Sequence, residues 1–343
     1  MPFLRISWHH GGTLAMKIFD GRWDGPHGIG RFSREVGRRL SGFERISLAG
    51  GPSDAFDPLR LTLYLRSIKP ELFVSPGYNA PLGAPCPFVF CVHDLNHLVM
   101  SENSSALKRA YYRYVMKPAL HRAQMVLTVS EFARRSICEW AGLPESCVRN
   151  VGNGISDAFG PVDLQKDDGR QPYFLYVGNH KPHKNFDRLL EAFALSQVRN
   201  DFLLMSTGSP TDRLRRRVEE LGLRERVRFV GEVSDHELAS LYRGATALVL
   251  VSLYEGFGLP LIEAMSCGTP VITSNVASMP EVAGNAAIQV DPLDVGAIAE
   301  SLTKLASDSE LRQRLRARGI ERARSYTWDI TASRVIEAIS ACV

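Results

Sequence analysis

Two glutamates eight positions apart lie in the stretch from residue 252 to residue 272. Glu255 falls in a glycine-containing loop that follows the apolar run Ala247–Val251, and such a run is typical of a buried parallel strand. Pro260 fits the first turn of a helix, whose unpaired N–H groups can hold a phosphate. Glu263 falls near the end of that turn, so both carboxylates can face one ligand and accept hydrogen bonds from its hydroxyl groups. The pattern therefore indicates a nucleotide-sugar site.

This stretch resembles the E-x7-E motif of the retaining GT-B glycosyltransferases of family four, also called group 1 glycosyltransferases. Gly-Phe-Gly, Pro260, Glu-Ala-Met and Gly-Thr-Pro-Val-Ile follow one another in the family's order. Without these flanking residues, two glutamates at this spacing would be read as solvated helix carboxylates. The resemblance implies an α/β fold of the GT-B type, in which two doubly wound Rossmann-like parallel-sheet domains face each other across a cleft.

The resemblance also assigns roles within the motif. Glu255 is expected to hold hydroxyl groups of the transferred sugar, and Glu263 is expected to hold the ribose diol of the nucleotide. The diphosphate is expected at the helix start, and the nucleobase against the backbone of another strand. The further donor contacts implied are Phe257, Gly258, Leu259 and Val230. The sequence shows no evident carboxylate nucleophile, and the resemblance implies that the leaving phosphate deprotonates the acceptor on the same face of the sugar.

Lys184 lies in a loop that follows the strand expected at Tyr173–Val177 and precedes a helix. A departing nucleoside diphosphate gains negative charge, which a basic side chain stabilises. Lys184 matches the family's diphosphate lysine, and the resemblance makes Glu255, Lys184 and His93 the expected catalytic residues. Family members commonly carry arginines at the positions of His183 and Asn179, so Lys184 bears more of this role, with His183 or Lys181 as helpers. The alternative is a solvated loop lysine.

Glycines also follow the first expected strand, in the segment from Gly25 to Phe32. Glycines at a strand-to-helix turn let the backbone approach an anion. The segment lacks the third glycine of the dinucleotide fingerprint, and a simple turn is the alternative. It resembles the family's glycine-rich loop near the donor diphosphate and the acceptor, which makes Gly28 and Gly30 expected donor contacts.

Four polar residues are expected on the acceptor side. His93 and Asp94 end the apolar run Phe88–Val92 and resemble the family's His-Asp step, whose histidine reaches the transferred sugar. A buried structural histidine, and an aspartate that caps the next helix, are the alternatives. Ser130 is first of all a helix N-cap, although the family has a similar segment. Asn153 resembles a loop on the hinge side that faces the cleft.

The chain reads as two halves of alternating strands and helices, a pattern typical of parallel sheets. We expect an N-terminal acceptor-side domain at residues 1–160 and a C-terminal nucleotide-sugar-binding domain at 170–325, joined by a polar, turn-rich linker. The helix at 326–343 is expected to cross back to the first domain or to be a plain terminal helix. Residues 1–15 are expected to be either a disordered extension or the product of an over-long start.

The expected elements can be stated as ranges. The strands are Lys17–Asp20, Ile46–Ala49, Leu72–Ser75, Phe88–Val92, Met125–Val129, Tyr173–Val177, Phe202–Met205, Val227–Val230, Ala247–Val251, Val271–Thr273 and Ala287–Val290. The helix expected at Ser104–Arg122 is rich in basic and tyrosine residues, so it is either a solvated face or a surface for anionic lipid headgroups.

Bulk properties restrict the possible classes. A chain of 343 residues can bury two cores, and a formal charge of +4 gives no case for nucleic acid. No apolar run has the length of a membrane span, and six scattered cysteines show no metal-site spacing. We therefore expect a cytoplasmic protein, possible peripheral contact with the inner face of the membrane, and neither a metal nor another cofactor.

The expected reaction is transfer of a hexose, with retention, from a nucleotide sugar to a hydroxyl of a glycan or lipid-linked oligosaccharide in surface polysaccharide synthesis. The Gly-Asn-His-Lys-Pro-His-Lys-Asn segment and the compact length resemble bacterial mannosyltransferases, so GDP-mannose is the first expected donor and a UDP-hexose the second. The alternatives are another GT-B enzyme, such as an epimerase or a phosphorylase, and a non-catalytic partner that binds nucleotide sugar.

Overall fold

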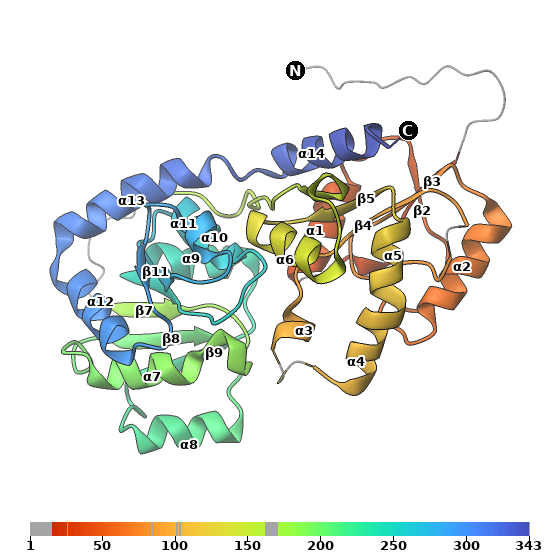
Figure 1. The fold of residues 1–343 in the computed structure, drawn as a ribbon. Helices are drawn as coiled ribbons and strands as arrows, with labels where there is room; N and C mark the ends of the chain where they lie inside the picture. The colour runs from red at the N-terminus through yellow and green to blue at the C-terminus, as the bar shows by residue number, and fades with distance from the viewer. Residues whose placement is uncertain are drawn as a thin grey trace.

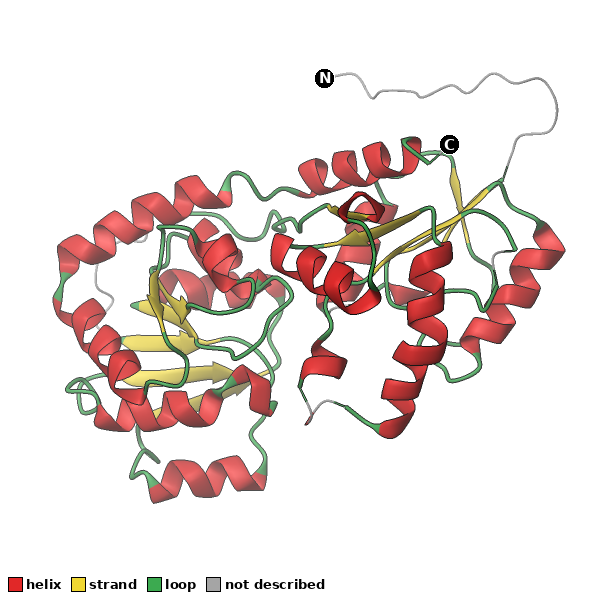
Figure 2. Cartoon of the chain, in the orientation of Figure 1, coloured by secondary structure: helices red, strands yellow, loops and turns green. Residues whose placement is uncertain are grey.

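The computed structural model describes residues 16–25, 27–83, 85–100, 102, 104–161 and 171–342. These residues form two six-stranded sheets in which every pair of adjacent strands is parallel. Helices lie on both faces of each sheet (Figures 1 and 2). The expected extension at residues 1–15 and most of the expected linker lie outside the described residues.

The first sheet has the strand order β2-β1-β3-β4-β5-β6. Its strands are β1 (Lys17–Phe19), β2 (Phe43–Arg45), β3 (Leu72–Ser75), β4 (Phe88–Cys91), β5 (Met125–Thr128) and β6 (Val148–Asn150). Its helices are α1 (Gly28–Gly37), α2 (Asp57–Ile68), α3 (Asn96–Val99), α4 (Ala106–Tyr111), α5 (Lys117–Arg122) and α6 (Glu131–Ala141). From β1 the chain first adds β2 on one side and then β3 on the other, so the strand order reverses between β1 and β3. Ligands of open α/β sheets bind beyond the carboxyl ends of the strands at such a reversal.

The second sheet has the order β12-β11-β10-β7-β8-β9. Its strands are β7 (Tyr173–Tyr176), β8 (Leu203–Thr207), β9 (Val227–Gly231), β10 (Ala247–Leu250), β11 (Val271–Ser274) and β12 (Ile288–Val290). Its helices are α7 (Phe186–Leu195), α8 (Asp212–Glu220), α9 (Asp235–Gly244), α10 (Leu259–Ser266), α11 (Met279–Ala283), α12 (Val295–Ser307) and α13 (Ser309–Ala323). The reversal lies between β7 and β10, which are adjacent.

Several expected elements differ from the observed ones. The second strand is Phe43–Arg45 rather than Ile46–Ala49, and the expected helix Ser104–Arg122 is interrupted by a π-helical turn at Tyr112–Met116. Helix α2 and strand β6 were not predicted. The strand β2 is an edge strand with exposed Glu44 and Arg45, so its sequence lacks the apolar signal of a central strand.

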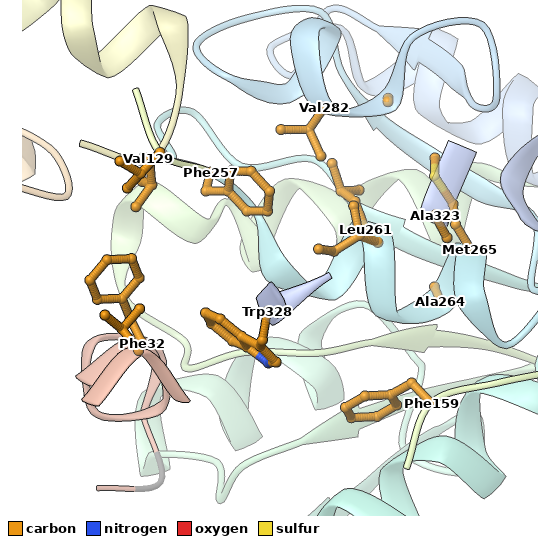
Figure 3. Close-up of a cluster of buried hydrophobic side chains, with 14 of the residues drawn as sticks. Phe32, Val129, Phe159, Phe257, Leu261, Ala264, Met265, Val282, Ala323 and Trp328 are labelled. Atoms are coloured by element: carbon orange, nitrogen blue, oxygen red, sulfur yellow. The ribbon is translucent and has the colours of Figure 1, made fainter. Parts of the chain in front are cut away.

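The two domains share a continuous apolar core. Phe32 and Val129 of the first domain meet Phe257 and Leu261 of the second, and Trp328 lies between them (Figure 3). Trp328 begins α14 (Trp328–Ser340), which lies over the first domain in Figure 1. Its neighbour Asp329 accepts a hydrogen bond from Arg39, in the turn after α1, at 2.7 Å. The two domains are therefore in direct contact.

Among the described residues, no helix combines the length and the apolar character that a membrane span requires.

Candidate functional site

Lys184 and Glu255 form an ion pair at the reversal point of the second sheet. The loop after β7 carries Lys184 and the loop after β10 carries Glu255, and because these strands are adjacent and parallel, their carboxyl ends meet. The Nζ of Lys184 lies 2.6 Å from Oε1 of Glu255, and the hydroxyl of Ser252 donates to the same oxygen at 2.8 Å. Both charged side chains are largely buried, with exposed fractions of 18% and 12%. The sequence analysis named both residues but not Ser252.

The Lys184 loop is held against β10 by Asn185. This buried residue has a φ of 61°, and its side-chain amide donates to the carbonyl groups of Val251 at 2.9 Å and Pro292 at 2.7 Å. Asparagine tolerates the left-handed region better than most residues, which explains its place directly after the lysine. Asn185 was not predicted from the sequence, although an asparagine between a loop and a helix is a recognisable turn signal.

His183 and Lys181, the two expected helpers of Lys184, differ in charge. Burial, and then the neighbouring Lys184 ammonium, lower the pKa of His183 to about 4. The imidazole is therefore neutral at pH 7 and adds no positive charge to the loop, and its role as a helper of Lys184 stays a prediction. Lys181 and Asn179 are exposed on the same loop.

Glu263 lies on α10 and is buried, with 3% of its surface exposed. Its Oε1 pairs with the guanidinium of Arg31, which comes from α1 of the first domain. Its Oε2 accepts a hydrogen bond from the hydroxyl of Tyr242 at 3.0 Å. Burial raises the pKa of Glu263, while Arg31 and Tyr242 oppose that rise. Neither partner was named by the sequence analysis.

The Glu255-Gly256 loop packs directly against the expected acceptor residues. A Cβ added at Gly256 would lie 2.7 Å from the carbonyl oxygen of His93 and 2.7 Å from Cβ of Asp94. Ser130 accepts a hydrogen bond from the N–H of Ala133 at 3.0 Å and donates to the carbonyl of Gly256 at 2.7 Å. Ser130 is therefore both the expected cap of α6 and a contact between the domains.

His93 is buried and hydrogen-bonded within the first domain. A carbonyl can only accept, so Nε2 of His93 donates to the Pro76 carbonyl at 2.9 Å. Burial lowers the pKa of His93, so the ring is neutral at pH 7. Asp94 accepts from the Tyr78 hydroxyl at 3.1 Å and from the N–H of Asn96 at 3.0 Å, at the start of α3. Asp94 therefore contacts the first N–H of α3, but the N-cap residue is Leu95, which makes no side-chain capping bond.

The glycine-rich segment lies opposite the start of α10. A Cβ added at Gly28 would lie 3.5 Å from a side-chain methyl of Leu259, so this glycine faces the expected diphosphate position. Gly30 behaves differently, because its N–H donates to Nδ1 of His27 at 3.1 Å and an added Cβ would lie 2.5 Å from the backbone of Gly25. Gly30 is thus required by the turn itself.

The remaining expected contacts are dispersed. Gly258 has a φ of 91° at the N-cap of α10, while Phe257 is buried against Tyr326 with ring centroids 5.6 Å apart. Val230 lies on the edge strand β9, two strands away from β7. Asn153 is buried, and its Oδ1 has no hydrogen-bond partner among the described residues. No cluster of His, Cys, Asp and Glu with the geometry of a metal site occurs in the described part of the chain, and the absence of a bound metal stays a prediction.

Replacing Gly256 by alanine is expected to lower kcat/KM by about 100-fold, the order of loss that a 1 Å misplacement of reacting groups can cause. The new methyl group would collide with backbone of the first domain and push the Glu255 loop away from His93. Steady-state kinetics measures the loss, and Gly160→Ala is the control because no atom of the described residues lies within 4 Å of its added Cβ. Equal activity of the two variants would contradict a requirement for this contact.

Comparison with known proteins shows relatives that resemble this chain in sequence and in fold. Residues 16–159 match the family described as "Glycosyltransferase Family 4", and residues 164–322 match "Glycosyl transferases group 1". The chain is 32% identical over 315 residues to O-antigen chain mannosyltransferase B of Escherichia coli, covering 88% of this chain and 82% of that protein.

Two solved structures share the fold at low sequence identity. Sucrose-phosphate synthase from Thermosynechococcus elongatus superposes with a TM-score of 0.77 at 20% identity, covering 95% of this chain and 98% of that one. HepE from Anabaena, solved with UDP and glucose, gives a TM-score of 0.74 at 16% identity, covering 95% of this chain and 100% of that one. The chain has the GT-B fold, and it belongs to the group 1 (family four) glycosyltransferases.

Proposed function

We propose that this protein is a retaining mannosyltransferase that transfers mannose from GDP-mannose to a hydroxyl group of a glycan or lipid-linked oligosaccharide during O-antigen-type polysaccharide synthesis. The observation that carries the proposal is the buried Lys184–Glu255 pair at the reversal point of the second sheet. The choice of mannose is supported by the relative named O-antigen chain mannosyltransferase B.

In this proposal the donor lies along the start of α10. Lys184 keeps its contact with Glu255 through one N–H and directs its other N–H groups at the donor diphosphate, while Glu255 also accepts hydrogen bonds from sugar hydroxyl groups. The bond between the anomeric carbon and the phosphate oxygen breaks, and the acceptor oxygen bonds to the same face of that carbon. The acceptor proton passes to the departing phosphate. The protein contributes position and charge rather than a nucleophile.

The first domain supplies the acceptor side of this arrangement. Neutral His93 and the unpartnered Oδ1 of Asn153 are buried in the first domain, and the Glu255 loop rests on His93. Asn153 Oδ1 is an acceptor that a sugar hydroxyl group can satisfy. We assign His93, Asp94, Ser130 and Asn153 to this side, with Ser130 and Asp94 acting through loop structure.

The proposed acceptor also has consequences for the location of the protein in the cell. On α4 and the turn after it, Leu107 and Tyr114 are 72% and 69% exposed, and Lys108, Arg109 and Arg113 are exposed beside them. Apolar and basic side chains together suit an anionic membrane surface. We therefore place the protein in the cytoplasm, in peripheral contact with the inner face of the membrane that holds a lipid-linked acceptor.

A panel of nucleotide sugars tests the donor directly. A ligand that binds only the native state at 100 times its Kd stabilises that state by about 2.7 kcal/mol. GDP-mannose is therefore expected to raise the Tm more than UDP-glucose, UDP-galactose or ADP-glucose at the same concentration. A larger shift with a UDP-hexose would replace the proposed donor.

Turnover without acceptor separates the remaining activities. A transferase leaves the sugar of GDP-mannose unchanged apart from slow hydrolysis when no acceptor is present, whereas an epimerase converts it. Binding of donor without transfer to any membrane extract would instead indicate a non-catalytic partner. No Tm shift with any nucleotide sugar or nucleoside diphosphate would reject the proposed site.

A further inference from the structure

Arg31 joins the two domains at the carboxylate expected to hold the nucleotide. It lies on α1, and its guanidinium pairs with Glu263 through Nη1 and with Asp235 through Nη2, the latter at 2.6 Å. Both partners belong to the second domain. The guanidinium also lies 5.8 Å from the ring centroid of Phe159, and only 11% of the side chain is exposed.

The surroundings of Glu263 explain why it needs this partner. The facing charged or titratable groups are Arg31 from α1, Tyr242 and Asp235 from α9, and Cys267 after α10. Burial raises the pKa of Tyr242 well above its usual value and that of Cys267 to about 11, so both are neutral at pH 7. Asp235 is negative, so within this group only Arg31 compensates the charge of the Glu263 carboxylate.

We propose that Arg31 is a positioning residue for the nucleotide, which holds the buried Glu263 carboxylate ionised and oriented to accept both hydroxyl groups of the ribose. The proposal rests on the proposed function, in which Glu263 binds the ribose diol. Because Arg31 and Glu263 belong to different domains, the ribose site is complete only while α1 and α10 are in contact.

The charge of Glu263 determines the sign of the pH effect. An ionised carboxylate accepts from two hydroxyl groups, whereas a protonated one has a proton to donate and less capacity to accept. Nucleotide affinity is therefore present above the pKa of Glu263 and falls as the pH drops through it. Removing Arg31 leaves burial and Asp235 in place, so the pKa of Glu263 rises and affinity is lost at a higher pH.

The experiment measures GDP binding by calorimetry between pH 5.5 and 9 for the full chain and its variants. Arg31→Met is expected to bind GDP roughly 10- to 100-fold more weakly at pH 7, the order expected for losing a hydrogen-bonded charge. Its affinity is expected to recover toward pH 9, and Arg31→Lys is expected to recover part of it at pH 7. Arg39→Met is the control, because Arg39 lies in the turn directly after α1 and pairs with Glu35 and Asp329 rather than with Glu263.

Glu263→Gln supplies the decisive comparison. It is expected to bind GDP weakly with no acid limb, and adding Arg31→Met to it is expected to change the affinity less than threefold. The proposal is overturned if Arg31→Met keeps the wild-type pH profile, or if it weakens binding equally in both backgrounds. If Arg31→Met unfolds, folding of the double variant supports charge compensation, and unfolding of both overturns it. Failure of the wild-type protein to bind any nucleoside diphosphate would instead reject the proposed function.

Discussion

Replacing Lys184 by methionine is expected to lower kcat by about 10²- to 10³-fold, the loss typical of removing one preorganised group that stabilises developing negative charge. Among the basic residues considered for this loop, His183 is neutral and Lys181 is exposed, so Lys184 supplies the buried positive charge. Methionine keeps the length and apolar stem of the side chain but not its ammonium. Turnover is measured with saturating donor and acceptor, and the melting temperature is recorded for each variant.

Lys304→Met is the matched control for this experiment, because Lys304 is exposed on α12. Lys184→Arg is expected to retain more activity than Lys184→Met, since it keeps the charge but not the compact geometry. Near-normal kcat of a folded Lys184→Met variant at saturating donor would show that the leaving group does not depend on this lysine. A change in KM alone would limit Lys184 to donor binding.

The local parts of the site were predictable because loops after apolar strands are visible in sequence. Lys184 and Glu255 each follow such a strand, and the family resemblance assigned both to one site. Sequence alone does not reveal strand order, and their contact at 2.6 Å depends on β7 and β10 being neighbours. The family resemblance therefore predicted that Lys184 and Glu255 share one site, which hydrophobic periodicity alone cannot predict.

The contacts between the domains could not be predicted in the same way. Arg31 and Glu263 are 232 positions apart, and their pairing depends on how the two domains are oriented. Arg31 lies within the glycine-rich segment, whose pattern predicts backbone contacts with phosphate and indicates nothing about a side-chain partner. The N–H of Gly30 donates to His27 within the turn, and the donor contact expected of Gly30 stays a prediction.

The errors in secondary structure have physical causes. Strand β6 is a three-residue edge strand in which only Val148 is buried, so it carries almost no pattern. The helical segment at 104–122 has strong helical character, and its π turn buries Tyr112 and Met116. One such turn changes which residues face the core without changing composition, and periodicity over the whole segment does not locate it.

Replacing Glu255 by glutamine is expected to lower kcat by about 100-fold or more, because a small misplacement of a group that contacts the reacting centre has that effect. Glutamine keeps the shape but loses the charge that holds the Lys184 ammonium at 2.6 Å. It also replaces one hydrogen-bond acceptor by a donor toward the sugar hydroxyl groups. Alanine is expected to lower kcat further. Kinetics at saturating donor measures both variants, with Glu300→Gln on the exposed face of α12 as the control.

A double variant tests whether Glu255 and Lys184 act together, which neither single variant can show. Residues that act as a unit have non-additive effects, so Lys184→Met combined with Glu255→Gln is expected to cost much less than the product of the two single losses. Ser252→Ala is expected to cost less than either, because Lys184 still contacts Glu255 when the hydroxyl is gone. If the two losses multiply, the residues contribute separately to turnover, and the Lys184–Glu255 pair is not a preorganised catalytic unit.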